Sequence, residues 1–357
     1  MAQEIIPKQY RHFIENNSTT WEKQECLYDL GQMLAPRGNE VFTSNEYYGL
    51  DLIVKAFINL DSSSSLKFGV PHGVELGDDG LGNVYGLGTN ISTLTYNNPI
   101  GLRNMLVNRV PGWKVPSEHP FLILMDQMNE LNLLQNKLIR KVTLFFPAHL
   151  QVDVNFMNNN YDQHVCSKLV AMRKNSTDIE ISLPGIDIFL NRHLAYENAG
   201  FKVVSSGNIF DPYFLSRFIN LVSSYDQVAT SEIGSHAFYT AALGVRTLFW
   251  DLGLPKIQPL TSQRRVENNY SVEANVEMLF QHNQFLPKNI AEEYLGGTRR
   301  PISRNYWNQL HEVSIKRDRY SFLEPVGDRK RFTIPRVLRR SLVKYIKRSI
   351  PAASSLI

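Results

Sequence analysis

The sequence predicts an α/β protein whose central sheet is parallel and covered by helices on both faces. Two observations lead to this expectation. Between Val142 and Asp251, short runs of apolar residues alternate with segments of helical length, and Gly or Pro marks several of the boundaries. Such alternation is typical of a doubly wound parallel sheet. The expected strands are Val142–Phe146, Ile179–Leu183, Lys202–Ser205, Gln227–Thr230 and Arg246–Trp250.

The helices between these strands have recognisable ends. Gly200 and Gly244 stand where two of them should stop, because glycine adopts the left-handed conformation without a Cβ clash. Asp211 has the position of an N-cap and Pro212 that of the first helical residue. The expected helices are Tyr161–Met172, Ile186–Ala199, one that follows Asp211, and Ser235–Leu243.

The chain before Val142 should form a first domain. Thr43 and Glu46 have the spacing of a capping box that would open a helix reaching Phe57, and Leu66–Val70 reads as a buried strand. The glycine-rich segment Gly73–Asn90 holds no G-x-G-x-x-G, so a dinucleotide fingerprint is absent. We expect domains at 1–135 and 136–328, followed by a tail at 329–357. Further helices are expected at Trp21–Leu34, Val272–Gln284, Ile302–Ile315 and Arg336–Ile350.

Composition narrows the class of protein. A chain of 357 residues exceeds the usual size of a single core, which favours two domains. Two cysteines, Cys26 and Cys166, make no disulfide framework, and the first residues contain no signal-peptide core. No apolar run is long enough to span a bilayer. We therefore expect a cytoplasmic protein.

The positive charge is concentrated in the tail. Nine Lys or Arg residues and no acidic residue lie between Arg329 and Arg348, so removing them from the net charge of +4 leaves −5 on the rest. This distribution argues against a nucleic-acid-binding domain. The segment Arg336–Ile350 reads as a basic amphipathic helix, suited either to the inner face of an anionic membrane or to the acidic body of the same chain.

The segment Gln227–Asp251 predicts a strand, a polar turn, a helix and a second strand. The first N–H groups of such a helix are unpaired, which makes the turn a candidate site for the phosphates of a nucleotide. Ser231 and Ser235 add hydroxyl donors, and Gly234 leaves room for a ligand. The alternative is an ordinary βαβ unit in which the serines only cap the helix.

Other polar residues also follow predicted strands. His72 follows the first-domain strand, His149 follows Val142–Phe146, and Ser206–Asn208 follow Lys202–Ser205. In an open parallel sheet, ligands bind at the carboxyl ends of the strands. Two such edges facing one another would form a site for a nucleotide-sugar.

Several of these segments resemble the GT-B-type glycosyltransferases of bacterial surface-polysaccharide loci. The resemblance covers roughly residues 40 to 255 and is carried by Val70–Gly73, Phe145–His149, Gly207–Arg217, Thr230–His236 and Ala241–Gly244. It implies two Rossmann-like domains facing a cleft, a nucleotide-sugar donor in the second domain and a glycan acceptor on the first. The product would be a capsule, an O-antigen or a related glycan, built on an acceptor that can be lipid-linked.

The resemblance also implies roles for the candidate residues. His72 would be the base that deprotonates the acceptor hydroxyl, because an imidazole titrates near neutrality, and His149 would contact donor or acceptor. Ser235 and His236 would stabilise the leaving phosphate. The donor site would also include Gly207, Asn208, Arg217, Ser231, Glu232 and Gly234.

Several alternatives stay open at this stage. His72 can instead be satisfied by neighbouring backbone, and Arg217 can pair with an acidic neighbour on a solvated helix face. Glu232 can favour the helix start rather than bind a ribose. No D-x-D triplet is present, so we expect a metal-independent enzyme with a nucleotide-sugar co-substrate and no cofactor. Neither retention nor inversion is indicated. A sugar-nucleotide epimerase and a non-catalytic carbohydrate-binding or assembly protein are the competing functions.

Overall fold

A computed structural model describes residues 35–70, 72–74, 93–96, 114–134, 139–148, 161–173, 178–253, 285–297, 308–309 and 311–312. The chain divides into two compact units, Met1–Asn308 and Gln309–Ile357. The elements below all belong to the first unit. The domain limits predicted at 135 and 328 stay predictions.

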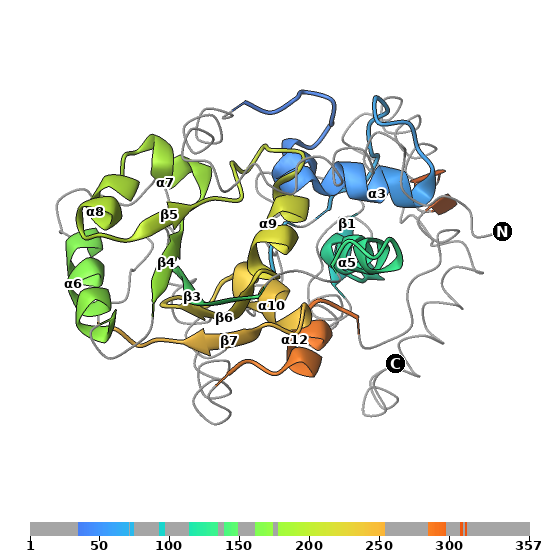
Figure 1. The fold of residues 1–357 in the computed structure, drawn as a ribbon. Coiled ribbons are helices and arrows are strands. Elements are labelled where there is room, and N and C mark those ends of the chain that lie inside the picture. The colour runs from blue at the N-terminus through green and yellow to red at the C-terminus, as the bar shows by residue number, and fades with distance from the viewer. Residues whose placement is uncertain are drawn as a thin grey trace, which may run out of the picture. The chain divides into compact units, whose positions relative to one another are not determined.

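A parallel sheet of five strands forms the centre of the second half of this unit (Figure 1). The strand order is β5-β4-β3-β6-β7, and every neighbouring pair is parallel. The predicted parallel α/β sheet is therefore confirmed, with strand ends within two residues of those expected. The strands are β3 (Arg140–Phe146), β4 (Ile179–Ser182), β5 (Lys202–Val204), β6 (Tyr225–Thr230) and β7 (Arg246–Phe249).

Helices cover both faces of this sheet. Side chains alternate along a strand, so Phe145 and Phe146 of β3 point to opposite faces. Phe145 belongs to a buried cluster that includes residues of α6 (Tyr161–Arg173) and α8 (His193–Asn198). On the opposite face, the Phe146 ring lies 6.0 Å from Phe218 in α9 (Phe214–Val222) and 4.9 Å from His236 in α10 (Ser235–Ala242).

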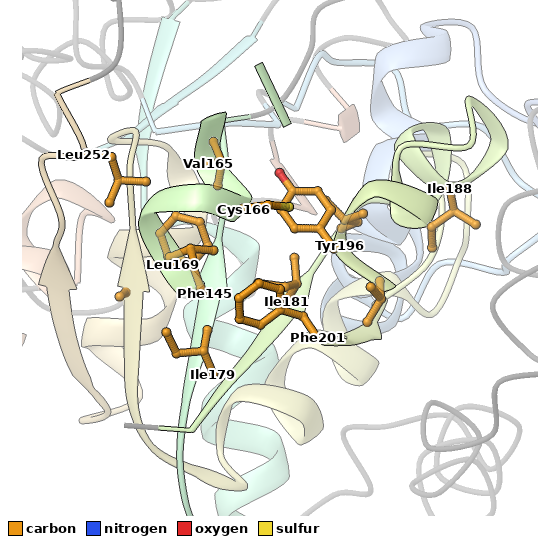
Figure 2. Close-up of a cluster of buried hydrophobic side chains, with 13 residues drawn as sticks. Phe145, Val165, Cys166, Leu169, Ile179, Ile181, Ile188, Tyr196, Phe201 and Leu252 are labelled. Atoms are coloured by element: carbon orange, nitrogen blue, oxygen red, sulfur yellow. The ribbon is translucent and has the colours of Figure 1, made fainter. Parts of the chain in front are cut away.

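Figure 2 shows the cluster on the first face. Burying apolar area of this kind is the main stabilising term of the fold, at about 25 cal/mol per Å² removed from water. Its members come from four of the strands, from α6, α7 (Gly185–Phe189) and α8, and from the loops beside them: Phe145, Val165, Cys166, Leu169, Ile179, Ile181, Leu183, Ile188, Tyr196, Phe201, Val203, Ala229 and Leu252.

The prediction of one continuous helix at Ile186–Ala199 is wrong. This segment forms two short helices, α7 and α8, separated at Asn191, whose φ of 61° is left-handed. The predicted cap at Asp211 is also displaced, because α9 begins only at Phe214. Asp211 instead accepts a hydrogen bond from the Tyr213 N–H at 2.9 Å and forms an ion pair with Arg217.

The described residues before β3 form helices and a second, two-stranded parallel sheet. The helical elements are η2 (Thr43–Gly49), α3 (Leu50–Ile58) and α5 (Pro120–Glu130), and β1 (Thr93–Tyr96) pairs with β2 (Lys114–Ser117). The strand predicted at Leu66–Val70 is reduced to a single bridge at Gly69. After β7, α12 (Lys288–Tyr294), which the sequence pattern did not predict, packs on α10.

The predicted capping box of Thr43 and Glu46 is not formed. The Glu46 carboxylate instead accepts backbone N–H groups of the preceding loop, including those of Asn39 at 2.8 Å and Glu40 at 3.1 Å. Tyr47 and Tyr48 then leave the helical region, and Tyr48 has a φ of 58°. Glu46 therefore anchors a loop, and the expected helix is interrupted before α3.

The turn between η2 and α3 lies directly against the start of α9. The Tyr48 N–H donates to the carbonyl of Ile209, and a Cβ added at Gly49 would collide with the Pro212 carbonyl oxygen. Gly49 also has a φ of +74°, so a side chain here is opposed both by space and by backbone conformation. This close approach fixes the elements before β3 next to α9.

Candidate active site

The strand order places a topological switch point between β3 and β6. These neighbours lie at the centre of the sheet, and the chain leaves β3 toward β4 on one side and β6 toward β7 on the other. Their carboxyl ends, Phe146 and Thr230, are paired. Crevices outside such a point are the usual ligand sites of open α/β sheets. The segments that begin at Pro147 and Ser231 therefore form the floor of the candidate site.

A hydrogen-bonded turn follows β6. The Thr230 hydroxyl donates to the Glu232 carbonyl at 2.6 Å, and the His236 Nε2 lies 2.8 Å from the same hydroxyl oxygen. Because a hydroxyl has one hydrogen, Nε2 must be the donor in the second bond. The imidazole also stacks on Phe146 at 4.9 Å with an interplanar angle of 21°. His236 thus joins the ends of β6 and β3.

Gly234 is the N-cap of α10 and has extended backbone, with a φ of −127°. A Cβ added here would lie 2.9 Å from His236 Nδ1 and 3.0 Å from its Cε1. A side chain at this position therefore requires the imidazole that packs over Gly234 to shift. No side chain caps this helix start in the described residues.

Ser235 and Ser231 have defined neighbours. The Ser235 hydroxyl accepts a hydrogen bond from the Val74 N–H at 2.9 Å and also bonds the Tyr239 phenol. The Ser231 N–H donates to the Phe146 carbonyl at 3.3 Å. Burial raises the pKa of Tyr161, while hydrogen bonds from Ser231 and the Ala148 backbone oppose that rise. Tyr161 thus lies between the loops that follow β3 and β6. The Glu232 side chain is exposed.

The loop after β5 contains Gly207, Asn208 and Asp211, and Asp211 pairs with Arg217 of α9. Gly207 has a φ of +110°, and a Cβ there would lie 2.6 Å from Asp211 Oδ2 and 2.7 Å from Arg217 Nη1. Arg217 forms a buried ion pair with Asp211 and donates to the Ser206 carbonyl at 3.0 Å. Arg217 does pair with an acidic neighbour, but the pair is buried rather than on a solvated helix face, and it orders this loop.

Two buried donors in the same loop have no hydrogen-bond partner among the described residues. They are the Ser206 hydroxyl and the Asn208 Nδ2, whose residues are 4% and 1% exposed. The Asn208 Oδ1 accepts the Phe210 N–H at 3.1 Å, which fixes the direction of the amide. Buried donors in folded proteins are almost always bonded to protein, water or ligand. The carboxyl end of β5 can therefore still bond a ligand atom or a water molecule.

His72 lies among aromatic rings. Its ring is 4.8 Å from that of Tyr47, at 85°, and 6.2 Å from that of Tyr48. Burial lowers the pKa of His72 to about 4, so the side chain is neutral at pH 7 and the expected titration near neutrality is wrong. Tyr47 also lies 5.3 Å from Phe210, which connects His72 to the loop containing Asn208. His149, the other predicted catalytic residue, lies outside the described residues.

The sequence did not predict two buried residues next to the His72–Val74 segment. Tyr239 contacts this segment directly, and His119 contacts Tyr239. His119 and Tyr239 are 0% and 4% exposed, and His119 Nε2 lies 2.9 Å from the Tyr239 hydroxyl. Tyr239 donates to the His72 carbonyl at 3.4 Å. Pro120 directly after His119 was a signal for a helix start, and His119 is indeed the N-cap of α5.

Two kinds of feature are absent from the described residues. These residues hold no group of three or more His, Cys, Asp or Glu side chains placed to hold a metal ion. Within the same ranges, no helix is long and apolar enough to cross a membrane.

Comparisons with known proteins give little further information. No protein-family model matches the chain, and no curated protein matches it. One similar solved structure is titled "Crystal Structure of TarM", with a TM-score of 0.28 and 10% sequence identity, and the match covers 75% of this chain and 52% of that one. The chain thus spans about half the length of TarM. Because a TM-score of 0.28 is too low to establish a shared fold, the site described above rests on this chain's own residues.

Proposed function

We propose that this protein is a glycosyltransferase that moves a sugar from a nucleotide-sugar donor to the acceptor glycan of a bacterial surface polysaccharide, such as a capsule or O-antigen. In this proposal two Rossmann-like domains of the GT-B type, at 1–135 and 136–328, contribute to the site. The reaction uses no metal. The acceptor is a glycan or a lipid-linked glycan, and the tail at 329–357 lies near the inner face of the membrane.

One observation carries the proposal. The start of α10 lies at the carboxyl edge of the sheet, beside the β3–β6 switch point, and the His72–Val74 segment is hydrogen-bonded to it through Ser235. The His72–Val74 segment and the start of α10, 161 residues apart in sequence, thus lie in contact, which supports assigning a base to the first and a phosphate site to the second. Transfer from a nucleotide-sugar needs both, because a phosphate leaves while an acceptor hydroxyl loses its proton.

Each candidate residue then has a role. The first N–H groups of α10, with Ser235 and His236, stabilise the leaving phosphate. His72 accepts the proton of the acceptor hydroxyl, which its neutral state at pH 7 permits. His149 contacts donor or acceptor. The loop with Gly207 and Asn208 contacts the nucleoside, and Arg217 holds that loop through Asp211.

The remaining candidates belong to the turn after β6. Ser231 supports the floor next to Phe146, and the Glu232 side chain, which is exposed, contacts a ribose hydroxyl of the donor.

Thermal stability in the presence of nucleotide-sugars tests the proposal. A panel with uridine, guanosine, cytidine and thymidine diphosphate sugars is added to the purified full chain, and the unfolding midpoint is recorded. A ligand at about 100 times its dissociation constant should stabilise the fold by about 2.7 kcal/mol. The stabilising donor is then incubated with glycan acceptors.

Several outcomes separate the candidate functions. Sugar transfer supports the proposal. Conversion of the donor into an epimer identifies an epimerase, and binding without turnover identifies a non-catalytic binding protein. Absence of any shift across the panel, in a folded protein, contradicts the proposal.

A further inference from the structure

The buried pair of His119 and Tyr239 has no role in the function proposed above, yet it connects three segments that are distant in sequence. His119 begins α5, Tyr239 lies in α10, and Tyr239 reaches the backbone of His72, 167 residues earlier. A buried side-chain hydrogen bond between residues 120 positions apart is made only by tertiary structure. Such a contact fixes the relative position of the elements that it joins.

The direction of the hydrogen bonds follows from the cap of α5. His119 Nδ1 accepts the Phe121 N–H at 3.0 Å, so this nitrogen carries no proton. Burial, with a smaller contribution from His72, lowers the pKa of His119 to about 3, so the ring is neutral and its hydrogen is on Nε2. Nε2 therefore donates to the Tyr239 hydroxyl oxygen, 2.9 Å away.

The phenol must then donate its own hydrogen to a different acceptor. That acceptor is the His72 carbonyl, 3.4 Å away. The Ser235 hydroxyl bonds the same phenol as a donor, since burial raises the pKa of Tyr239 and the hydrogen bond from Ser235 lowers it. Ser235 also accepts the Val74 N–H at 2.9 Å. The chain of bonds thus runs from α5 through Tyr239 to both ends of the short segment His72–Val74. This segment carries the proposed base, and Ser235 belongs to the proposed phosphate site.

The ring of Tyr239 is held independently of its hydroxyl. It stacks on Phe121 with centroids 4.4 Å apart and an interplanar angle of 16°, and it meets Phe218 edge-on at 5.9 Å. Phenylalanine at position 239 would keep both contacts. The hydroxyl can therefore be removed while the ring stays in place.

We propose that Tyr239 is a positioning residue, which together with His119 fixes the His72–Val74 segment against the start of α10 and so sets the place of His72 relative to the donor phosphates. The proposal rests on the proposed function for the part that concerns catalysis. Its geometric part, the fixing of Val74 on Ser235, is independent of any substrate.

Two variants interrupt the chain at different points. Tyr239→Phe removes the hydroxyl, and His119→Asn keeps an N-cap acceptor for Phe121 while losing the reach to Tyr239. Tyr225→Phe is the matched control. Tyr225 is 2% exposed and bonds Glu180 at 2.6 Å, at the opposite end of the sheet from the switch point.

Hydrogen–deuterium exchange of a peptide containing Gly73 and Val74 is measured first, on the full chain without ligand. In Tyr239→Phe and in His119→Asn we expect exchange to be up to about tenfold faster than in the wild type, since one net hydrogen bond is lost. The double variant should exchange no faster than either single variant, because both interrupt the same chain. Tyr225→Phe should leave this peptide unchanged.

Kinetics with the donor found by the thermal panel form the second measurement. Both single variants should lower kcat about tenfold or more, with binding of the free nucleoside diphosphate unchanged within about twofold. If the wild type neither binds nor uses a nucleotide-sugar, the proposed function fails while the exchange result still decides the geometric part. Exchange at Val74 equal to that of the wild type in folded Tyr239→Phe overturns the inference, as does an additive double variant.

Discussion

Gly234 and Gly207 both stand where a side chain would collide with a polar neighbour, but for different reasons. At Gly207 the backbone itself is left-handed, and the neighbours are the ion-paired Asp211 and Arg217. At Gly234 the backbone is one that any residue adopts, and only the His236 ring opposes a side chain. Substitution at 234 should therefore act on the turn after β6 rather than on the backbone conformation of the loop.

Gly234→Val should abolish nucleotide-sugar binding in a protein that still folds. The added side chain would displace His236 from Gly234 and from Phe146, and the turn at the start of α10 would be blocked. Isothermal titration with the stabilising donor, alongside the variant's own unfolding midpoint, makes the comparison. Unchanged affinity would exclude the start of α10 as the donor site.

His72→Ala should lower turnover by about 10²–10⁴-fold, the usual loss when a general base is removed, with little change in donor affinity. Because burial lowers the pKa of His72 to about 4, the wild-type base is already mostly unprotonated at pH 5. The titration of His72 should then produce no change in activity between pH 5 and pH 8. Wild-type turnover in the variant would remove His72 from the mechanism.

His119 should make the fold sensitive to acid. Its folded pKa of about 3 lies below the unfolded value of 6.5, so the unfolded chain binds the proton first. Stability from this group is present above pH 6.5 and falls as the pH decreases, by about 2 kcal/mol at pH 5.

A comparison of the wild type with His119→Asn isolates the loss of stability that the protonation of His119 causes. Glu118, whose pKa is raised to about 7 by burial and by Asp126, acts with the opposite sign but is common to both chains. Urea denaturation at pH 7.5 and pH 5 should show a smaller acid loss in the variant. An equal loss in both would contradict the prediction.

At the scale of elements, the sequence predicted most of what local patterning controls. The strands from β3 to β7 and the end of α10 at Gly244, with a φ of +81°, follow from local composition. The break between α7 and α8 at Asn191 does not follow from local composition. It is stabilised by the contact of Arg192 with Asp162, which lies 30 residues away. The polar turn between β6 and α10 was likewise predicted, while its binding of a donor stays a proposal.

The partner of Ser235 in that turn was not predicted. Val74 lies 161 residues earlier, and no local signal joins the two. The same holds for His119 and Tyr239, whose contact is set by the packing of α5 on α9 and α10 rather than by any short motif.

Arg192 ties several elements together. It pairs with Asp162 of α6 and with Asp187 of α7, each at 2.6 Å, and it donates to the Ala148 carbonyl at 3.4 Å in the loop after β3. Its side chain is 5% exposed. The pair of short helices therefore supports the floor of the candidate site as well as the core.

Arg192→Met should destabilise the fold by about 3–5 kcal/mol, because it leaves two largely buried carboxylates without their partner. Arg173→Met is the matched control. Arg173 and its partner Asp178 are 45% and 74% exposed, so the loss there should be under about 1 kcal/mol. Denaturant midpoints and slopes measure both variants. Equal effects would mean that the Arg192 pairs contribute no more than a surface pair.

At the scale of the whole molecule, the positive charge is concentrated near the C-terminal end of the sequence. The nine basic residues between Arg329 and Arg348 follow a body of opposite net charge. This segment lies outside the described residues, and its place stays a prediction from sequence. The two expected locations, an anionic membrane and the acidic body, differ in a measurable way.

The full chain should cosediment with vesicles containing anionic lipid, whereas a chain ending at Val326 should not. Each basic residue near an anionic surface contributes about 1 kcal/mol. Arg336→Gln with Arg339→Gln and Arg340→Gln is the control, since it keeps the apolar residues of the tail. Equal sedimentation of both chains, or none by either, would exclude the tail as a membrane anchor.

The central place of β3 has a consequence for how the protein is made. β3 pairs with β4 on one side and with β6 on the other, and β6 follows only after α6, α7, α8 and α9 have been synthesised. Until then, a nascent chain presents one long edge of β3 without its neighbour, and open strand edges of this kind recruit other chains. Ribosome-associated chaperones would therefore be needed most during elongation from Phe146 to Thr230.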